Sequence, residues 1–102
     1  MAENTTHELD QPYGVPIAEK LSEYLKLYNS TGDRANVSAQ TGLGASTLRD
    51  VTYRLNNLTE NNERGVLALI ETAVANAQKQ ITDAQEAIEF FNNLKSCNHE
   101  RV

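Results

Sequence analysis

The residues best suited to chemistry lie close together, in the stretch TGLGASTLRDVTYRL at positions 41–55. Ser46 and Thr47 supply hydroxyl groups, and Arg49 supplies a planar guanidinium with several N–H donors. Hydroxyl and guanidinium groups hydrogen-bond well to oxygen acceptors, including phosphates and the edges of nucleic-acid bases. This stretch is therefore the candidate binding surface of the chain.

The sequence does not indicate a catalytic or metal site. His7 and His99 lie near the two ends, and no pattern pairs either one with a carboxylate or a nucleophile. The single cysteine, Cys97, excludes an internal disulfide and an all-cysteine metal site. Cys97 and His99 together offer only two ligands in a polar terminal segment. We expect no enzyme activity, no cofactor and no metal.

The charge of the chain limits how it can bind nucleic acid. The formal net charge is −5 over 102 residues, which argues against nonspecific coating of nucleic acid, because phosphate affinity requires clustered Lys and Arg. The charge is unevenly distributed: residues 17–64 hold six acidic and six basic residues, so the stretch of interest lies in a neutral part of the chain.

Two helices are predicted before this stretch. Few large apolar residues occur at the N-terminus, so residues 1–14 are predicted to be a flexible tail. Asp33 is the predicted N-cap of a short helix over 33–41 that ends at Gly42. A helix over 17–29 precedes it, with Tyr24 and Tyr28 expected in the core, because its apolar residues follow helical spacing: Ile17, Leu21, Tyr24, Leu25 and Tyr28.

A third helix is predicted to begin at the N-cap Ser46. Leu48, Val51 and Leu55 have the spacing of a buried stripe. Tyr53 lies at the border of that stripe. The residues left toward solvent or a partner are Thr47, Arg49, Asp50, Thr52 and Arg54.

Residues 34–55 resemble the helix-turn-helix of the phage-repressor and LacI-like DNA-binding class. The resemblance is carried by Thr41-Gly42-Leu43 followed by Ser46-Thr47-Leu48, with Val37, Ser38 and Val51 at the positions that hold the two helices together. It implies that the second helix enters the major groove of double-stranded DNA, with Arg49 reading the O6 and N7 atoms of guanine. Asp50 makes this helix less basic than is usual in the class. The predicted DNA-binding residues are Ala45, Ser46, Thr47, Arg49, Asp50, Tyr53 and Arg54.

A long helix is predicted over 65–95, after a polar loop at 56–62 in which Leu58 is the one anchor. Small and apolar residues recur there at steps of three and four, the spacing of a coiled-coil seam with one four-residue insertion. A small domain cannot cover the whole seam, so we expect a homodimer or higher homo-oligomer. The alternative is a break near 78–83, with the chain folding back as a hairpin. The predicted dimerisation residues are Ala73, Ala77, Ile81, Ala84, Ile88 and Phe91.

Together these patterns predict an all-α protein with a helix-turn-helix unit at 15–64, the long helix at 65–95 and a flexible tail at 96–102. The predicted function is sequence-specific DNA binding by a small bacterial or phage repressor that acts as a dimer. The alternative is an acidic helical interaction or assembly module that binds protein and not DNA. With no signal peptide or membrane span visible, the expected location is the cytoplasm of a bacterium or phage-infected cell.

Overall fold

The computed structural model describes residues 8–100, with side chains described as far as residue 95. No strand occurs in this range, and the predicted all-α fold with a long C-terminal helix is confirmed. The last helix is continuous through 78–83, so the hairpin alternative is wrong. The helices of the described range are α2 (Glu19–Tyr28), α3 (Thr31–Thr41), α4 (Ala45–Thr52) and α5 (Glu63–Glu100).

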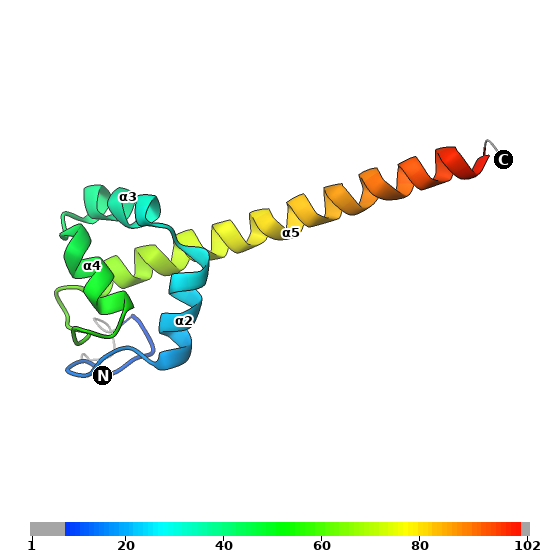
Figure 1. The fold of residues 1–102 in the computed structure, drawn as a ribbon. Helices are drawn as coiled ribbons and strands as arrows, with labels where there is room; N and C mark the ends of the chain where they lie inside the picture. The colour runs from blue at the N-terminus through cyan, green and yellow to red at the C-terminus, as the bar shows by residue number, and fades with distance from the viewer. Residues whose placement is uncertain (1–7, 101–102) are drawn as a thin grey trace.

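Three short helices pack around the first part of α5, and the rest of α5 projects away from them as a single rod (Figure 1). The molecule is therefore elongated, with principal extents of 67 × 31 × 23 Å. No helix in the described range combines the length and the apolar character needed to cross a bilayer. The core lies at the base of the rod and consists of Ile17, Leu25, Val37, Leu43, Leu48, Val51, Leu58, Val66 and Leu69.

The start of α3 is fixed by a reciprocal cap. The hydroxyl of Ser30 accepts the backbone N–H of Asp33 at 3.1 Å, and the Asp33 carboxylate accepts the Ser30 backbone N–H at 2.9 Å. This second hydrogen bond holds the pKa of Asp33 below its ordinary value. The prediction of Asp33 as N-cap is wrong, because Ser30 takes that position and α3 begins at Thr31.

The turn between α3 and α4 has the chemistry predicted for it. Gly42 adopts a left-handed conformation with φ of 80°, which glycine allows without strain. The Ser38 hydroxyl donates to the carbonyl of Leu43 at 2.6 Å, which fastens the turn to α3. Gly65 allows α5 to approach this turn and α4 closely, since a Cβ at position 65 would lie 2.5 Å from the Leu48 side chain and 2.6 Å from the Leu43 side chain.

The end of α4 differs from the prediction. The helix stops at Thr52 because Arg54 adopts φ of 64°, which turns the chain away from the helical path. Leu55 is consequently 70% exposed and not part of the buried stripe, and Leu58 reaches the core as predicted. Thr52, expected toward solvent, is buried, and its Oγ1 has no hydrogen-bond partner.

The ordered packing begins within the predicted N-terminal tail, before residue 15. Helix α2 begins at Glu19, two residues later than predicted. Leu9 and Tyr13 lie against the core, and the Glu63 carboxylate accepts both the Leu9 N–H at 2.8 Å and the Tyr13 hydroxyl at 2.7 Å. Of the two tyrosines expected in the core, Tyr24 is half exposed and Tyr28 is only partly buried. Residues 1–7 and 101–102 of the two predicted tails lie outside the described residues. The prediction of a tail from residue 96 is wrong, because α5 continues to Glu100.

Candidate nucleic-acid interface

The first turn of α4 presents small polar groups to solvent. Ala45 and Ser46 are exposed, and Thr47 is half-buried. Gly44, and not the predicted Ser46, is the N-cap, and it provides no side-chain hydrogen bond to the first turn. Backbone N–H groups at a helix start carry partial positive charge and bind anions when no capping side chain occupies them. This turn can therefore donate hydrogen bonds from both its backbone and the Ser46 hydroxyl.

Arg49, the predicted base reader, is held by its neighbour. Its Nε and one terminal nitrogen lie 3.2 Å and 2.9 Å from the same carboxylate oxygen of Asp50. The Arg49 side chain is 56% exposed, and a guanidinium has five N–H donors, so it retains donors for a partner. Because the ion pair is exposed to water, its net stabilisation is small, and the two side chains separate at low cost.

Tyr53 lies directly after α4, and two basic side chains lie over its ring. The ammonium of Lys26, from α2, is 5.2 Å from the ring centroid, and the guanidinium of Arg34, from α3, is 5.9 Å from it. Both distances are typical of cation–π contacts. Tyr53 is 45% exposed, so the cluster is open to a partner. Lys26 and Arg34 are not indicated by any sequence pattern, since only the packing of the three helices brings them to Tyr53.

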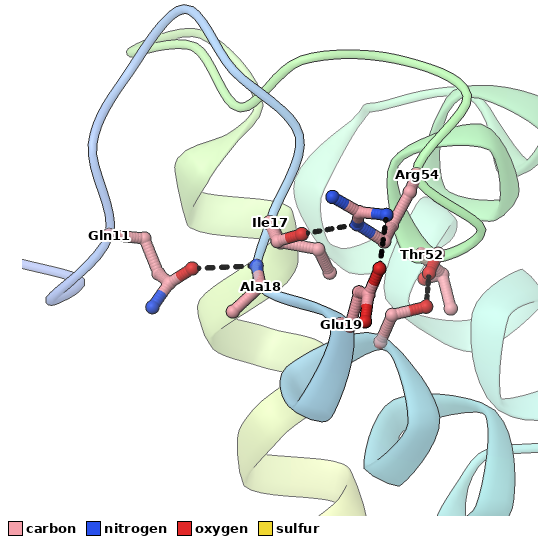
Figure 2. Close-up of polar contacts among 7 residues, drawn as sticks. Gln11, Ile17, Ala18, Glu19, Thr52 and Arg54 are labelled. Carbon is pink, nitrogen blue, oxygen red and sulfur yellow. Dashed lines mark hydrogen bonds and ion pairs between the residues drawn. The ribbon is translucent and has the colours of Figure 1, made fainter.

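The Arg54 side chain points toward the start of α2, as Figure 2 shows. Its Nε donates to the Ile17 carbonyl at 2.7 Å, and its guanidinium lies 3.5 Å from the Glu19 carboxylate. Beside it, the buried Ser22 hydroxyl donates to the Thr52 carbonyl at 2.6 Å. These contacts fasten the end of α4 to α2, and Arg54 lines the same groove as Tyr53 and Lys26 with its donors already used within the protein.

The electrostatic character of this surface is mixed. A groove of about 330 Å³ runs between α2 and the end of α4 and contains Lys26 and Tyr53, but also Glu19 and Glu23. The cations beside Tyr53 therefore lie next to carboxylates, and Arg49 lies next to Asp50. Such an arrangement binds phosphate less strongly than an all-basic strip would.

The predicted dimerisation residues fall into two groups. Ala73 packs against the core, and Ala77 lines a groove between α5 and α2. The remaining four lie on the projecting part of α5 and are exposed: Ile81, Ala84, Ile88 and Phe91.

No protein-family model matches the chain, and neither a curated protein nor a solved structure matches it significantly. The resemblance of residues 34–55 to repressor helix-turn-helix units therefore stays a prediction that depends on the residues themselves.

Proposed function

We propose that this protein is a sequence-specific double-stranded DNA-binding regulator, a small bacterial or phage repressor that acts as a homodimer. The observation that carries the proposal is the surface of α4, where exposed Ser46 and Arg49 precede a tyrosine with two cations on its ring. Hydroxyl, guanidinium and ammonium groups from three helices thus lie around one short helix that follows a tight turn.

In the proposed complex, α4 enters the major groove. Its eight residues span about 12 Å at 1.5 Å per residue, similar to the width of that groove. Ser46 and the N–H groups of the first turn bind a phosphate, and Lys26 and Arg34 bind the flanking backbone. Arg49 exchanges its contact with Asp50 for the O6 and N7 atoms of a guanine.

A dimer supplies what one copy lacks. The mixed charge around α4 makes a single interface weak, and a second copy doubles the number of phosphate contacts. The exposed apolar residues on the projecting part of α5 support self-association, because a helix with such a stripe is stabilised when the stripe is covered.

The test is a selection from randomised duplexes at low salt, followed by measurement of affinity for the selected site. Arg49→Ala is expected to lower that affinity by about 1–3 kcal/mol and to relax preference at one base pair, with helical content unchanged. Lys79→Ala, a matched loss of one exposed cation on α5, is expected to leave the affinity unchanged. Failure of the wild-type protein to prefer any duplex would contradict the proposal.

The second candidate is an acidic helical interaction module that binds protein and not DNA. The observations that favour it are the net charge of −5 and the carboxylates beside Arg49 and Lys26. The same selection separates the two candidates, because this module would recover no preferred duplex while still associating through α5.

A further inference from the structure

An apolar groove lies in the angle between α2 and α5. It has a volume of about 200 Å³ and is lined by Leu21, Tyr24 and Tyr28 from α2 and by Ile70, Val74 and Ala77 from α5. An apolar cavity of about 150 Å³ accepts benzene, so this groove has room for one aromatic ring. Tyr24 and Val74 are each about half exposed, which leaves the groove open to such a ring.

Exposed aromatic residues lie near the other end of the same helix. Phe90 and Phe91 are 61% and 60% exposed, and Leu94 is exposed beside them. The rings of Phe90 and Phe91 contact each other with centroids 6.0 Å apart. The C-terminal part of α5 that carries them projects away from α2, α3 and α4 (Figure 1). The chain therefore carries an open apolar groove and a set of exposed aromatic side chains on one rigid rod.

A continuous stripe joins these two features. From Val74 onward, apolar residues recur at steps of three and four without interruption, which is the spacing of the inward-facing positions of a coiled coil. The stripe consists of Val74, Ala77, Ile81, Ala84, Ile88 and Phe91.

The positions that flank this stripe carry no charge. In coiled coils, charged residues at the flanking positions set partner choice, and like charges there repel. Here the flanking positions are filled by Gln78, Gln80, Gln85, Ala87, Asn92 and Leu94, whereas the charged residues Lys79, Asp83, Glu86 and Glu89 all lie at outer positions. Two copies of an acidic chain can therefore meet along this face without repulsion.

The sizes of the residues in the stripe distinguish the two possible orientations. Parallel pairing would stack Ile81 on Ile81 and Ala84 on Ala84, which makes the layers alternately wide and narrow. Antiparallel pairing sets Ile81 against Ala84, Ile88 against Ala77, and Phe91 against Val74. Every inner layer then has the same composition, as dense and uniform packing requires.

We propose that two copies pair through α5 in antiparallel orientation, and that Phe91 of each copy fills the α2–α5 groove of the other. The inference rests on the self-association included in the proposed function. Val74, Ile81, Ile88, Phe91 and Leu94 leave roughly 540 Å² uncovered per copy if a whole side chain presents about 200 Å². With the groove residues added, this area approaches the about 800 Å² per partner of a standard interface.

The pairing has a consequence for the operator. Gly65, where α4 packs on α5, lies opposite position 100 of the other copy, so the two α4 helices are separated by about 50 Å along the rod at 1.5 Å per residue. The half-sites are then more than one helical turn of about 34 Å apart.

Disulfide trapping tests the orientation in a Cys97→Ser background. An Ala77→Cys chain is mixed with an Ile88→Cys chain, and the full-length products are oxidised and identified by mass spectrometry. Antiparallel pairing is expected to give a disulfide between position 77 of one copy and position 88 of the other. Lys79→Cys mixed with Glu86→Cys is the matched control, because these positions share a layer but lie on the outer side, and no disulfide is expected.

Two outcomes would overturn the inference: disulfides joining position 88 of both copies, which indicates parallel pairing, or no disulfide in any mixture. Sedimentation gives a second readout without cysteines. Phe91→Ala is expected to weaken the dimer about tenfold or more, and Glu89→Ala to leave it unchanged. No DNA enters either measurement, so a failed DNA selection and a failed pairing are distinguishable.

Discussion

The two halves of α5 carry similar apolar residues at similar spacing, but only the first half is covered. Val66 and Leu69 are 1% and 0% exposed, whereas Ile81 and Ile88 are 57% and 56% exposed. The difference arises because α2, α3 and α4 fold back only as far as the first half (Figure 1). Helical periodicity thus predicts that a helix has an apolar face, but it does not say what covers that face.

The polar contacts divide at nearly the same place. The Asn29 side chain donates to the Leu69 carbonyl at 3.0 Å, and the Asn76 side chain donates to the Tyr28 carbonyl at 2.7 Å. In the described part of the chain beyond Asn76, the contact is local: Lys79 donates to Asp83 one turn away at 2.9 Å. Asn76 therefore marks the border between the packed half and the projecting half of α5.

The largest difference in the free energy of unfolding is expected between two truncations of large aliphatic residues, one in the packed region and one on the projecting half of α5. Leu48→Ala is expected to lower the free energy of unfolding by about 2–5 kcal/mol, because Leu48 is fully buried between α4 and α5. Ile81→Ala is expected to cost less than about 0.5 kcal/mol in dilute protein, because more than half of the Ile81 surface is exposed and no other helix packs on it. Urea denaturation at low concentration measures both.

Raising the protein concentration sharpens this contrast. If α5 associates, wild-type stability rises with concentration, and the cost of Ile81→Ala rises with it. A concentration-independent cost equal to that of Leu48→Ala would show that the projecting half is already covered within one copy.

The helices that pack on the first half of α5 were predictable from the sequence at positions whose conformation or burial depends on a single helix or turn. Gly42, Leu43, Leu48 and Val51 occupy the predicted places, because glycine and apolar spacing act locally. The prediction for Leu55 is wrong because it depended on Arg54 continuing the helix, and residue type gives no sign that Arg54 adopts a positive φ.

A smaller effect is expected from the buried polar contact that joins α2 to α4. Ser22→Ala removes the donor that lies 2.6 Å from the Thr52 carbonyl and leaves this carbonyl buried without that partner, which costs about 1–3 kcal/mol. Thr82→Ala removes a hydroxyl from an exposed position of the projecting half and should change stability by less than about 0.5 kcal/mol. Equal losses in the two variants would contradict the division into a packed and a projecting half.

The candidate site was predictable only in part, for a related reason. Ser46, Arg49 and Tyr53 follow from one helix and its exposed side, so the sequence indicates them. Lys26 and Arg34 reach Tyr53 from two other helices, and no local pattern encodes the angles at which helices cross.

The smallest effect on stability is expected at the start of α5, where the Tyr13 hydroxyl donates to the Glu63 carboxylate. This hydrogen bond raises the pKa of Tyr13 from 10.0 to about 12. Because the folded pKa lies above the unfolded one, the contribution is complete below pH 10 and is lost as the pH rises toward 12. Tyr13→Phe is expected to lower stability at neutral pH and to flatten its decline between pH 10 and 12. Thermal unfolding of both proteins across this range measures the change, and parallel declines would show that the Tyr13 hydrogen bond does not link the N-terminal segment to α5.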